Sequence, residues 1–174
     1  MARLPVLSLE EMPDKTRNMI TGGKSQLSGL NINRMMAHAE NSVRHFMRLG
    51  NSLLTQAKLD PRLRELVILR IAKLCSSKYE WHQHVIIARQ VGVPEEQISS
   101  LSQDPDPSVF NPQELAILRY TEEVITNVKS SAEAFEKLSE FLSHQEIVEL
   151  TLTIGFYNMV AQFLENTEVE IEGM

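Results

Sequence analysis

Hydrophobic residues recur along most of the chain with the spacing of an α-helix rather than the alternation of a β-strand. The segment from Asn33 to Leu54 shows this spacing and is predicted to be one helix, with Gly50 as its weak point. The clearest case begins at Asp60, which can cap a helix, followed by Pro61, which suits the first helical position. An apolar face then continues to Leu74, so this stretch is predicted to be helical.

A second helix is predicted directly after the first, because serine hydroxyls at Ser76 and Ser77 can cap free N–H groups. Glu80 follows Ser77 at the spacing of a capping box. This helix is predicted to run to Val91, and a shorter one to follow from Pro94 to Leu101.

The second half of the chain begins with a loop rich in Asp and Pro, "SQDPDPSVFNPQE". Three more helices are predicted after it, over "ELAILRYTEEVITNV", "AEAFEKLSEFL" and "HQEIVELTLTIGFYNMVAQFLENTEVEIE". The fold class is therefore all-α, a single-domain bundle of about six to eight helices.

The first part of the chain has turn signals at Pro5, Pro13 and the Gly22-Gly23 pair, with little apolar periodicity. Residues 1–32 are predicted to form an N-terminal arm with at most a short helix, and residues 33–174 the helical domain. One internal similarity is present: "ELVILR" and "ELAILR" match at all but one position, which is compatible with a duplicated helical unit or with chance.

Composition narrows the function classes. The chain has 174 residues, 43% of them hydrophobic, which is enough for a core of its own. Its net charge of −6 and the absence of a dense basic stripe argue against a nucleic-acid partner. A single cysteine excludes an intramolecular disulfide and favours a cytoplasmic location. No unbroken apolar run suits a signal sequence or a membrane span.

The densest chemistry lies in "CSSKYEWHQHVIIAR". On a helix, His82 and His84 point roughly 200° apart, so they cannot share a metal ion. Glu80 and His84 are four residues apart and therefore neighbours. A carboxylate beside an imidazole raises the histidine pKa and fixes its tautomer, as a general acid or base requires. The alternative is an ordinary surface pair.

Three other residue types in this region have two interpretations each. Glu65 stands in the apolar stretch "LRELVILRIA", and it needs a partner if it faces the interior, but not on a solvated face. Tyr79 and Trp81 either pack in the core or contact a substrate. Cys75 has no second cysteine to resolve an oxidised thiol, which favours a structural role.

Together, "RELVILRIAKLCSSKYEWHQHVIIARQVGVPEEQI" resembles the carboxymuconolactone decarboxylase family, in the superfamily that also contains alkyl hydroperoxidase D. The resemblance extends over roughly Asn33 to Glu170, since the last predicted helix is similar to the closing helix of that family. It implies an alkyl hydroperoxidase D-like bundle, a small-molecule substrate, a homo-oligomer with pockets close to subunit contacts, and no membrane partner.

The peroxidase branch of this superfamily has two redox cysteines between a glutamate and a histidine. Counted back from His84, its cysteine positions hold Ser77 and Glu80 here, and its glutamate position holds Glu65. Cys75 is two residues out of register. The resemblance therefore favours the decarboxylase branch, which works without a metal or an organic cofactor.

In that branch a substrate carboxylate leaves as its electrons move into a conjugated carbonyl. The resemblance implies that His84 is the acid that reprotonates carbon, with Glu65 or Glu80 beside it. Arg70, Tyr79 and Trp81 are the expected substrate-binding residues. Two alternatives stay open, an alkyl hydroperoxidase-like antioxidant with peroxiredoxin activity and a non-catalytic helical oligomer. The natural substrate is not predicted.

Overall fold

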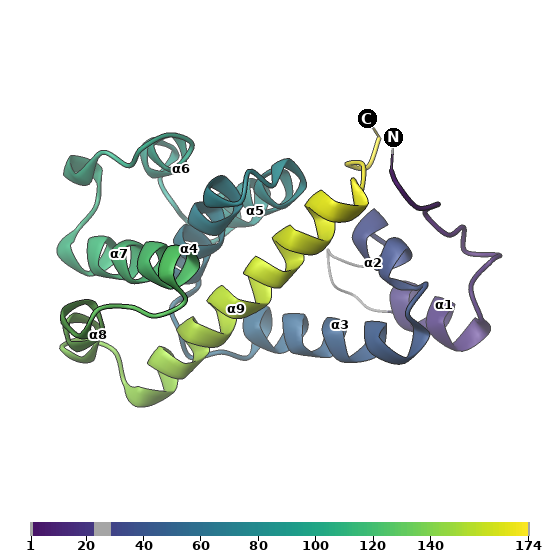
Figure 1. The fold of residues 1–174 in the computed structure, drawn as a ribbon, viewed down its shortest axis with the longest axis horizontal. Coiled ribbons are helices and arrows are strands. Elements are labelled where there is room, and N and C mark those ends of the chain that lie inside the picture. Colours follow the sequence, from purple (N-terminus) through teal and green to yellow (C-terminus); the bar gives the residue numbers. More distant parts are fainter. Residues whose placement is uncertain (1, 23–28, 174) are drawn as a thin grey trace. The chain divides into compact units, whose positions relative to one another are not determined.

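The computed structural model describes residues 2–22 and 29–173, and in these residues all regular structure is helical (Figure 1). The all-α fold class is therefore confirmed. The helices are α1 (Asp14–Thr21), α2 (Asn31–Met36), α3 (Glu40–Thr55), α4 (Pro61–Leu74), α5 (Lys78–Gln90), α6 (Glu95–Leu101), the 3₁₀-helix η1 (Pro107–Val109), α7 (Pro112–Asn127), α8 (Ala132–Ser139) and α9 (His144–Thr167).

The chain forms two compact units. One comprises residues 1–55 and 163–174, and the other comprises residues 56–162. In the first unit the two ends of the chain are bound together, because Arg3 forms an ion pair with Glu168 and Asn31 donates to the carbonyl of Glu170. The second unit contains every residue that the sequence analysis assigned to the site.

Helix α4 is the centre of the second unit, and α5, α6 and α7 pack against it. Its start is as predicted: the Asp60 side chain accepts hydrogen bonds from the N–H groups of Arg62 and Leu63, and Pro61 occupies the first turn. All nine residues from Arg64 to Ala72 are buried. In a helix that is buried on every side, a polar side chain is tolerated only where it has a hydrogen-bonding or oppositely charged partner.

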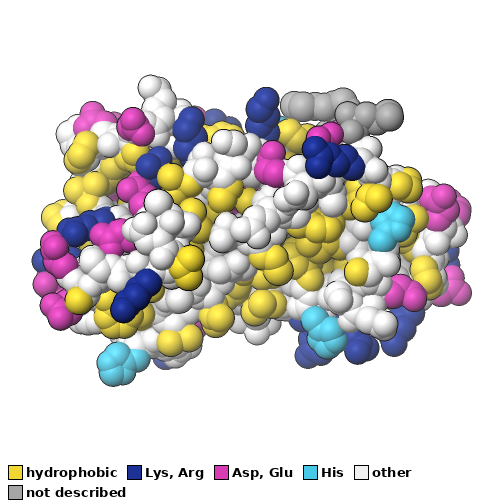
Figure 2. Space-filling model, viewed as in Figure 1, with side chains coloured by type: hydrophobic (Ala, Val, Ile, Leu, Met, Phe, Trp, Pro, Cys, Tyr) yellow, Lys and Arg dark blue, Asp and Glu magenta, His cyan; other side chains and the backbone are white. Residues whose placement is uncertain are grey.

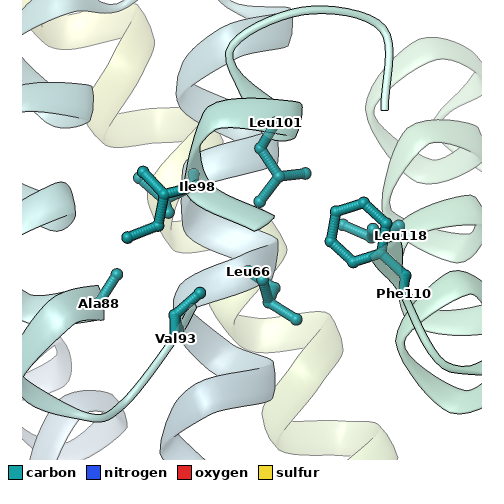
Figure 3. Packing of buried hydrophobic residues seen from close by; sticks show 8 residues of the cluster. Leu66, Ala88, Val93, Ile98, Leu101, Phe110 and Leu118 are labelled. Atoms are coloured by element: carbon teal, nitrogen blue, oxygen red, sulfur yellow. The ribbon is translucent and has the colours of Figure 1, made fainter. Parts of the chain in front are cut away.

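Four elements contribute to one hydrophobic cluster around α4 (Figure 3). Leu66 and Leu69 come from α4, and residues of α5, α6, α7 and two connecting segments surround them: Ala88, Val93, Ile98, Leu101, Phe110 and Leu118. Burying an aliphatic side chain of this size contributes about 1.5–3 kcal/mol. The cluster therefore fixes α5 against α4, and with it the side chains that these two helices share.

The predicted capping box at the start of α5 is wrong. Ser77 occupies the N-cap position, but its hydroxyl makes no capping hydrogen bond. The turn is held instead by the Ser77 N–H, which donates to the Ala72 carbonyl at 2.8 Å. A capping box does form at α7, between Asn111 and Glu114. Glu80 does not take part in the predicted capping box, because its side chain is buried in the interior.

Two helix boundaries also differ from the predictions. The helix expected over residues 33–54 is two helices, α2 and α3, separated by a turn at residues 37–39, and Gly50 lies buried inside α3. In that turn His38 Nε2 lies 2.8 Å from the carbonyl oxygen of Pro5, a contact that periodicity cannot reveal. Helix α9 ends at Thr167 because Glu168 adopts a left-handed conformation, φ 52°. Of the predicted Gly22-Gly23 turn, Gly23 lies outside the described residues.

Helix α9 is the one element of the described residues with the length and composition of a possible membrane span. It is long enough to cross a bilayer, and an 18-residue window in it has a mean hydropathy of 1.4. Half of that window is buried inside the protein. Length and composition are thus weak evidence for a membrane span.

The surface over α7 and α8 carries charges of both signs, which are interspersed in Figure 2. Arg119 pairs with Glu123 and Glu133, and Lys137 pairs with Glu140. Exposed pairs of this kind contribute about 0–1 kcal/mol each, so these helices are held mainly by their buried faces.

Candidate functional site

A buried hydrogen bond joins α4 to α5. The Glu65 side chain is 0% exposed and its Oε2 lies 2.8 Å from Nδ1 of His84, which is 4% exposed. Arg64, also buried, donates from Nε to the other oxygen, Oε1, at 3.0 Å. Glu65 therefore has both of its oxygens occupied, one by a guanidinium and one by an imidazole.

This arrangement defines the roles of the two ring nitrogens of His84. Because Arg64 holds the Glu65 carboxylate as an acceptor, Nδ1 of His84 is the donor toward Oε2. Nε2 is then the nitrogen left to take up or release a proton. A histidine held in this way by a carboxylate has the orientation of a general acid or base.

Tyr157, from α9, completes the wall around the imidazole. Its ring meets that of His84 edge-on, with centroids 4.8 Å apart and an interplanar angle of 88°. Burial raises the pKa of Tyr157 well above its ordinary value, and the negative charges of Glu65 and Glu80 raise it further. The phenol therefore stays protonated at neutral pH.

Two more buried polar side chains lie on α5, toward its first turn. Glu80 is 2% exposed, and its position four residues before His84 puts both on one face of the helix. Ser77, three residues earlier, is 1% exposed, and its hydroxyl has no hydrogen-bond partner in the described part of the chain. Ser77, Glu80 and His84 thus form a polar stripe along the inner face of α5.

One end of this stripe borders a pocket of about 420 Å³. His84 is not part of the pocket wall, while Ser77 is. The wall consists of the end of α4, the turn that follows, the start of α5 and one residue after α6: Ala72, Lys73, Ser76, Ser77, Lys78, Trp81 and Ser102. The polar stripe therefore leads from an open pocket to the buried His84.

Residues 40–123 match the carboxymuconolactone decarboxylase family. This part of the chain is similar to that family. The matched region contains α3 to α6 and most of α7, and with them the Glu65–His84 pair and the pocket. A search of curated protein sequences finds no match.

Several solved structures have the same fold. The alkylhydroperoxidase AhpD core of Ralstonia eutropha JMP134, an uncharacterized peroxidase-related protein, superposes with a TM-score of 0.84 at 18% identity, covering 99% of this chain and 93% of that one. A peroxidase-related protein from Silicibacter sp. TM1040 gives 0.82 at 17%, covering 98% and 91%. The debrominase Bmp8 with 2,3,4-tribromopyrrole gives 0.75 at 13%, covering 99% and 95%. These likenesses show the fold.

Ser77 and Glu80 stand at the positions that the sequence analysis assigned to the two redox cysteines of the peroxidase branch. Both are buried on the His84 face of α5. The single cysteine, Cys75, is half-buried with its Sγ 3.6 Å from Oδ1 of Asn158, and it is not part of the pocket wall. No three His, Cys, Asp or Glu side chains among residues 2–22 and 29–173 are grouped to hold a metal ion.

The structure separates the three predicted substrate-binding residues. Trp81 lines the pocket. Tyr79 is buried and lies outside the pocket wall. Arg70 is occupied elsewhere, because its Nε donates to Glu122 Oε1 at 2.6 Å. The predicted catalytic residues fare differently, since Glu65 and His84 bond directly and Glu80 lies on the same helix face.

Sequence reasoning missed two neighbours of the site. Arg64 directly precedes Glu65, so the dipeptide itself was a signal that a buried glutamate would have a cationic partner. Tyr157 gave no such signal, because it reaches His84 from a helix far along the chain. The second copy of the repeat gave no signal for these neighbours. Its glutamate, Glu114, has different partners from those of Glu65, namely Arg62, Gln97 and the backbone of Asn111.

Proposed function

We propose that the chain is a cofactor-independent enzyme that decarboxylates a small carboxylated lactone or β-carbonyl acid, with His84 as the proton donor. The observation that carries the proposal is the buried hydrogen bond between Glu65 and His84. It orients an imidazole and leaves its Nε2 for proton transfer. The similarity of residues 40–123 to the carboxymuconolactone decarboxylase family supports this type of chemistry without identifying the substrate.

The reaction balances with groups that the chain itself supplies. The bond between the α-carbon and the carboxylate breaks, CO₂ leaves, and the electron pair moves into the conjugated carbonyl. His84 then gives up a proton, which Glu80 delivers to carbon, and His84 regains a proton from water. Glu65 stabilises the imidazolium that exists before this transfer, and Arg64 keeps Glu65 in place.

The polar stripe on α5 supplies a route between pocket and histidine. The substrate binds in the pocket, where Ser77 forms part of the wall. Glu80 lies between Ser77 and His84 on the same face of α5, so it relays the proton to the pocket.

A thiol peroxidase is the weaker alternative. Structural neighbours include peroxidase-related proteins, but both positions that resemble the redox cysteines hold other residues here. A non-catalytic oligomer is the other alternative. We propose a homo-oligomer on the basis of the family, and this does not conflict with catalysis.

The proposal is tested by the ultraviolet-monitored decay of 4-carboxymuconolactone and of a panel of β-carbonyl acids. We expect turnover by the natural protein and a decrease of roughly 10²–10⁴-fold in kcat for His84→Gln, the range for loss of a general acid. His82→Gln is the matched control, since His82 lies on the same helix but outside the site. Its activity should be unchanged.

Two results would contradict the proposal. One is equal turnover by His84→Gln and the natural protein, with thermal unfolding showing that both are folded. The other is the absence of turnover across the whole panel together with peroxide consumption that Cys75→Ser abolishes. The second result would establish the peroxidase alternative instead.

A further inference from the structure

The pocket beside α5 has the chemistry of an anion site. Lys73 and Lys78 both line it, and neither forms an ion pair within residues 2–22 and 29–173. Lys78 is the first residue of α5, where the helix dipole favours a negative charge over a positive one. An anion in the pocket would balance the positive charges of both lysines and the positive end of the helix dipole.

The start of α5 is also free to bind a ligand. No described side chain caps it, which distinguishes it from α4, α7 and α8. The N–H groups in the first turn of a helix have no partner within the helix and bind carboxylates and phosphates well. A helix end alone is common, however, and a second feature is needed to indicate a ligand.

Ser77 provides that second feature. Its side chain is 1% exposed and lines the pocket, and its hydroxyl has no partner among the described residues. Buried hydroxyls are normally hydrogen-bonded, so an unpaired one requires an explanation. Because Ser77 forms part of the pocket wall, its hydroxyl is a donor that an oxygen of a bound ligand would satisfy.

The remaining wall selects the type of anion. Trp81 presents an indole ring and Ala72 a methyl group, both suited to a flat apolar body rather than to a small hydrated ion. We propose that this pocket is the carboxylate-binding subsite for a small conjugated acid, with Ser77 as hydrogen-bond donor and Lys73 and Lys78 as its cations. The inference rests on the proposed function and assigns it the binding residues that Arg70 and Tyr79 do not supply.

The chain has one tryptophan, so fluorescence excited at the indole band reports on this pocket alone. The full-length protein is titrated with benzoate, with benzamide, which has the same shape but no charge, and with inorganic phosphate. We expect a saturable change of Trp81 emission with benzoate. Benzamide and phosphate should each bind at least about tenfold more weakly, since charge-assisted bonds need the carboxylate and the indole needs the ring.

Variants assign the effect to residues. Ser77→Ala should weaken benzoate about tenfold, and Lys73→Gln with Lys78→Gln by more than that, with loss of the salt dependence. The control is Lys129→Gln, an exposed lysine outside the pocket wall, which should bind benzoate normally. Ser77→Ala removes no hydrogen bond within the described residues, so the variant should remain folded.

The failure of this inference is distinct from failure of the proposed function. Benzoate binding is measured in the natural protein and in His84→Gln, which should bind it equally because His84 is not part of the pocket wall. Binding without turnover by any substrate would support the subsite and contradict the decarboxylase. Equal binding of benzamide, equal binding of phosphate, or no response to benzoate would each overturn the carboxylate subsite, whatever the turnover shows.

Discussion

At the scale of single residues, the site consists of polar groups that are expensive to bury. Glu65 is fully buried, and each of its oxygens has a partner, Arg64 for one and His84 for the other. Removing one partner of such a pair typically destabilises a protein by about 3–5 kcal/mol, since it leaves a charge uncompensated. Variants of His84 and Glu65 must therefore be compared by activity per folded molecule.

Tyr157 gives a prediction about alkaline pH. Its pKa is raised in the folded protein, by burial first and by Glu65 and Glu80 next, whereas an unfolded tyrosine has a pKa of about 10. Its contribution to stability is therefore complete below pH 10 and is lost as the pH rises toward the folded-state pKa. Above pH 10 the unfolded state releases this proton first, so the free energy of unfolding falls by up to about 1.4 kcal/mol per pH unit.

Tyr157→Phe removes this contribution. We expect the natural protein to lose stability faster than Tyr157→Phe between pH 9.5 and about 11. Urea unfolding of both proteins at several pH values measures the difference, and their stabilities at pH 8 serve as the reference. Parallel loss of stability in the two proteins would show that Tyr157 ionises in the folded state as easily as in the unfolded one.

At the scale of helices, capping residues in the sequence predicted a helix start correctly where their side chains bond to the adjacent backbone. Asp60 and Pro61 fixed the start of α4 from sequence, and the structure has the predicted capping bonds there. The same logic failed at α5, where Ser77 and Glu80 have the spacing of a capping box but face the interior. Spacing cannot tell which way a helix turns its first residues, since packing against α4 decides that.

The candidate site also has parts that the sequence predicted and parts that it did not. Glu65 and His84 were predicted, because the family pattern marks them, and their bond to each other is found. The pocket was not predicted, since it forms where the end of α4, the start of α5 and Ser102 meet. Arg70 was expected to bind substrate, but a glutamate on α7 takes its guanidinium. Which of several possible partners an arginine binds depends on the three-dimensional fold and cannot be read from the sequence.

The capping box of α7 allows a quantitative test. The Asn111 side chain accepts from the N–H groups of Gln113 and Glu114, while Glu114 also binds Arg62 and the amide of Gln97. Asn111→Ala should lower the free energy of unfolding by about 1 kcal/mol. Glu114→Ala should cost more, about 2–3 kcal/mol, because it also removes the ion pair with Arg62 and one of the two acceptors of the buried Gln97 amide.

Chemical denaturation measures both variants, with Glu136→Ala as the control. Glu136 is an exposed residue of α8, and its replacement should change stability by less than about 0.5 kcal/mol. If Asn111→Ala cost as much as Glu114→Ala, the contacts of Glu114 beyond the cap would contribute nothing to stability.

At the scale of the whole molecule, the candidate site is confined to one compact unit. Residues 56–162 include Arg64, Glu65, Ser77, His84 and Tyr157. Within this unit α4 is covered by three other helices and carries the only run of nine consecutive buried residues in the described chain. Side chains of the candidate site keep their geometry best on an element that rarely unfolds locally. The burial of α4 makes it that element.

Native-state hydrogen exchange tests this directly. The amides of α4 from Arg64 to Ala72 should exchange only through global unfolding, with the largest free energy of opening in the protein. Helix α1 has eight residues, of which only Thr16 and Ile20 are buried, and its amides should open at a much lower free energy. If α1 and α4 opened at the same free energy, the two units would unfold as one, and the stability of the site would depend on the whole chain rather than on the packing around α4.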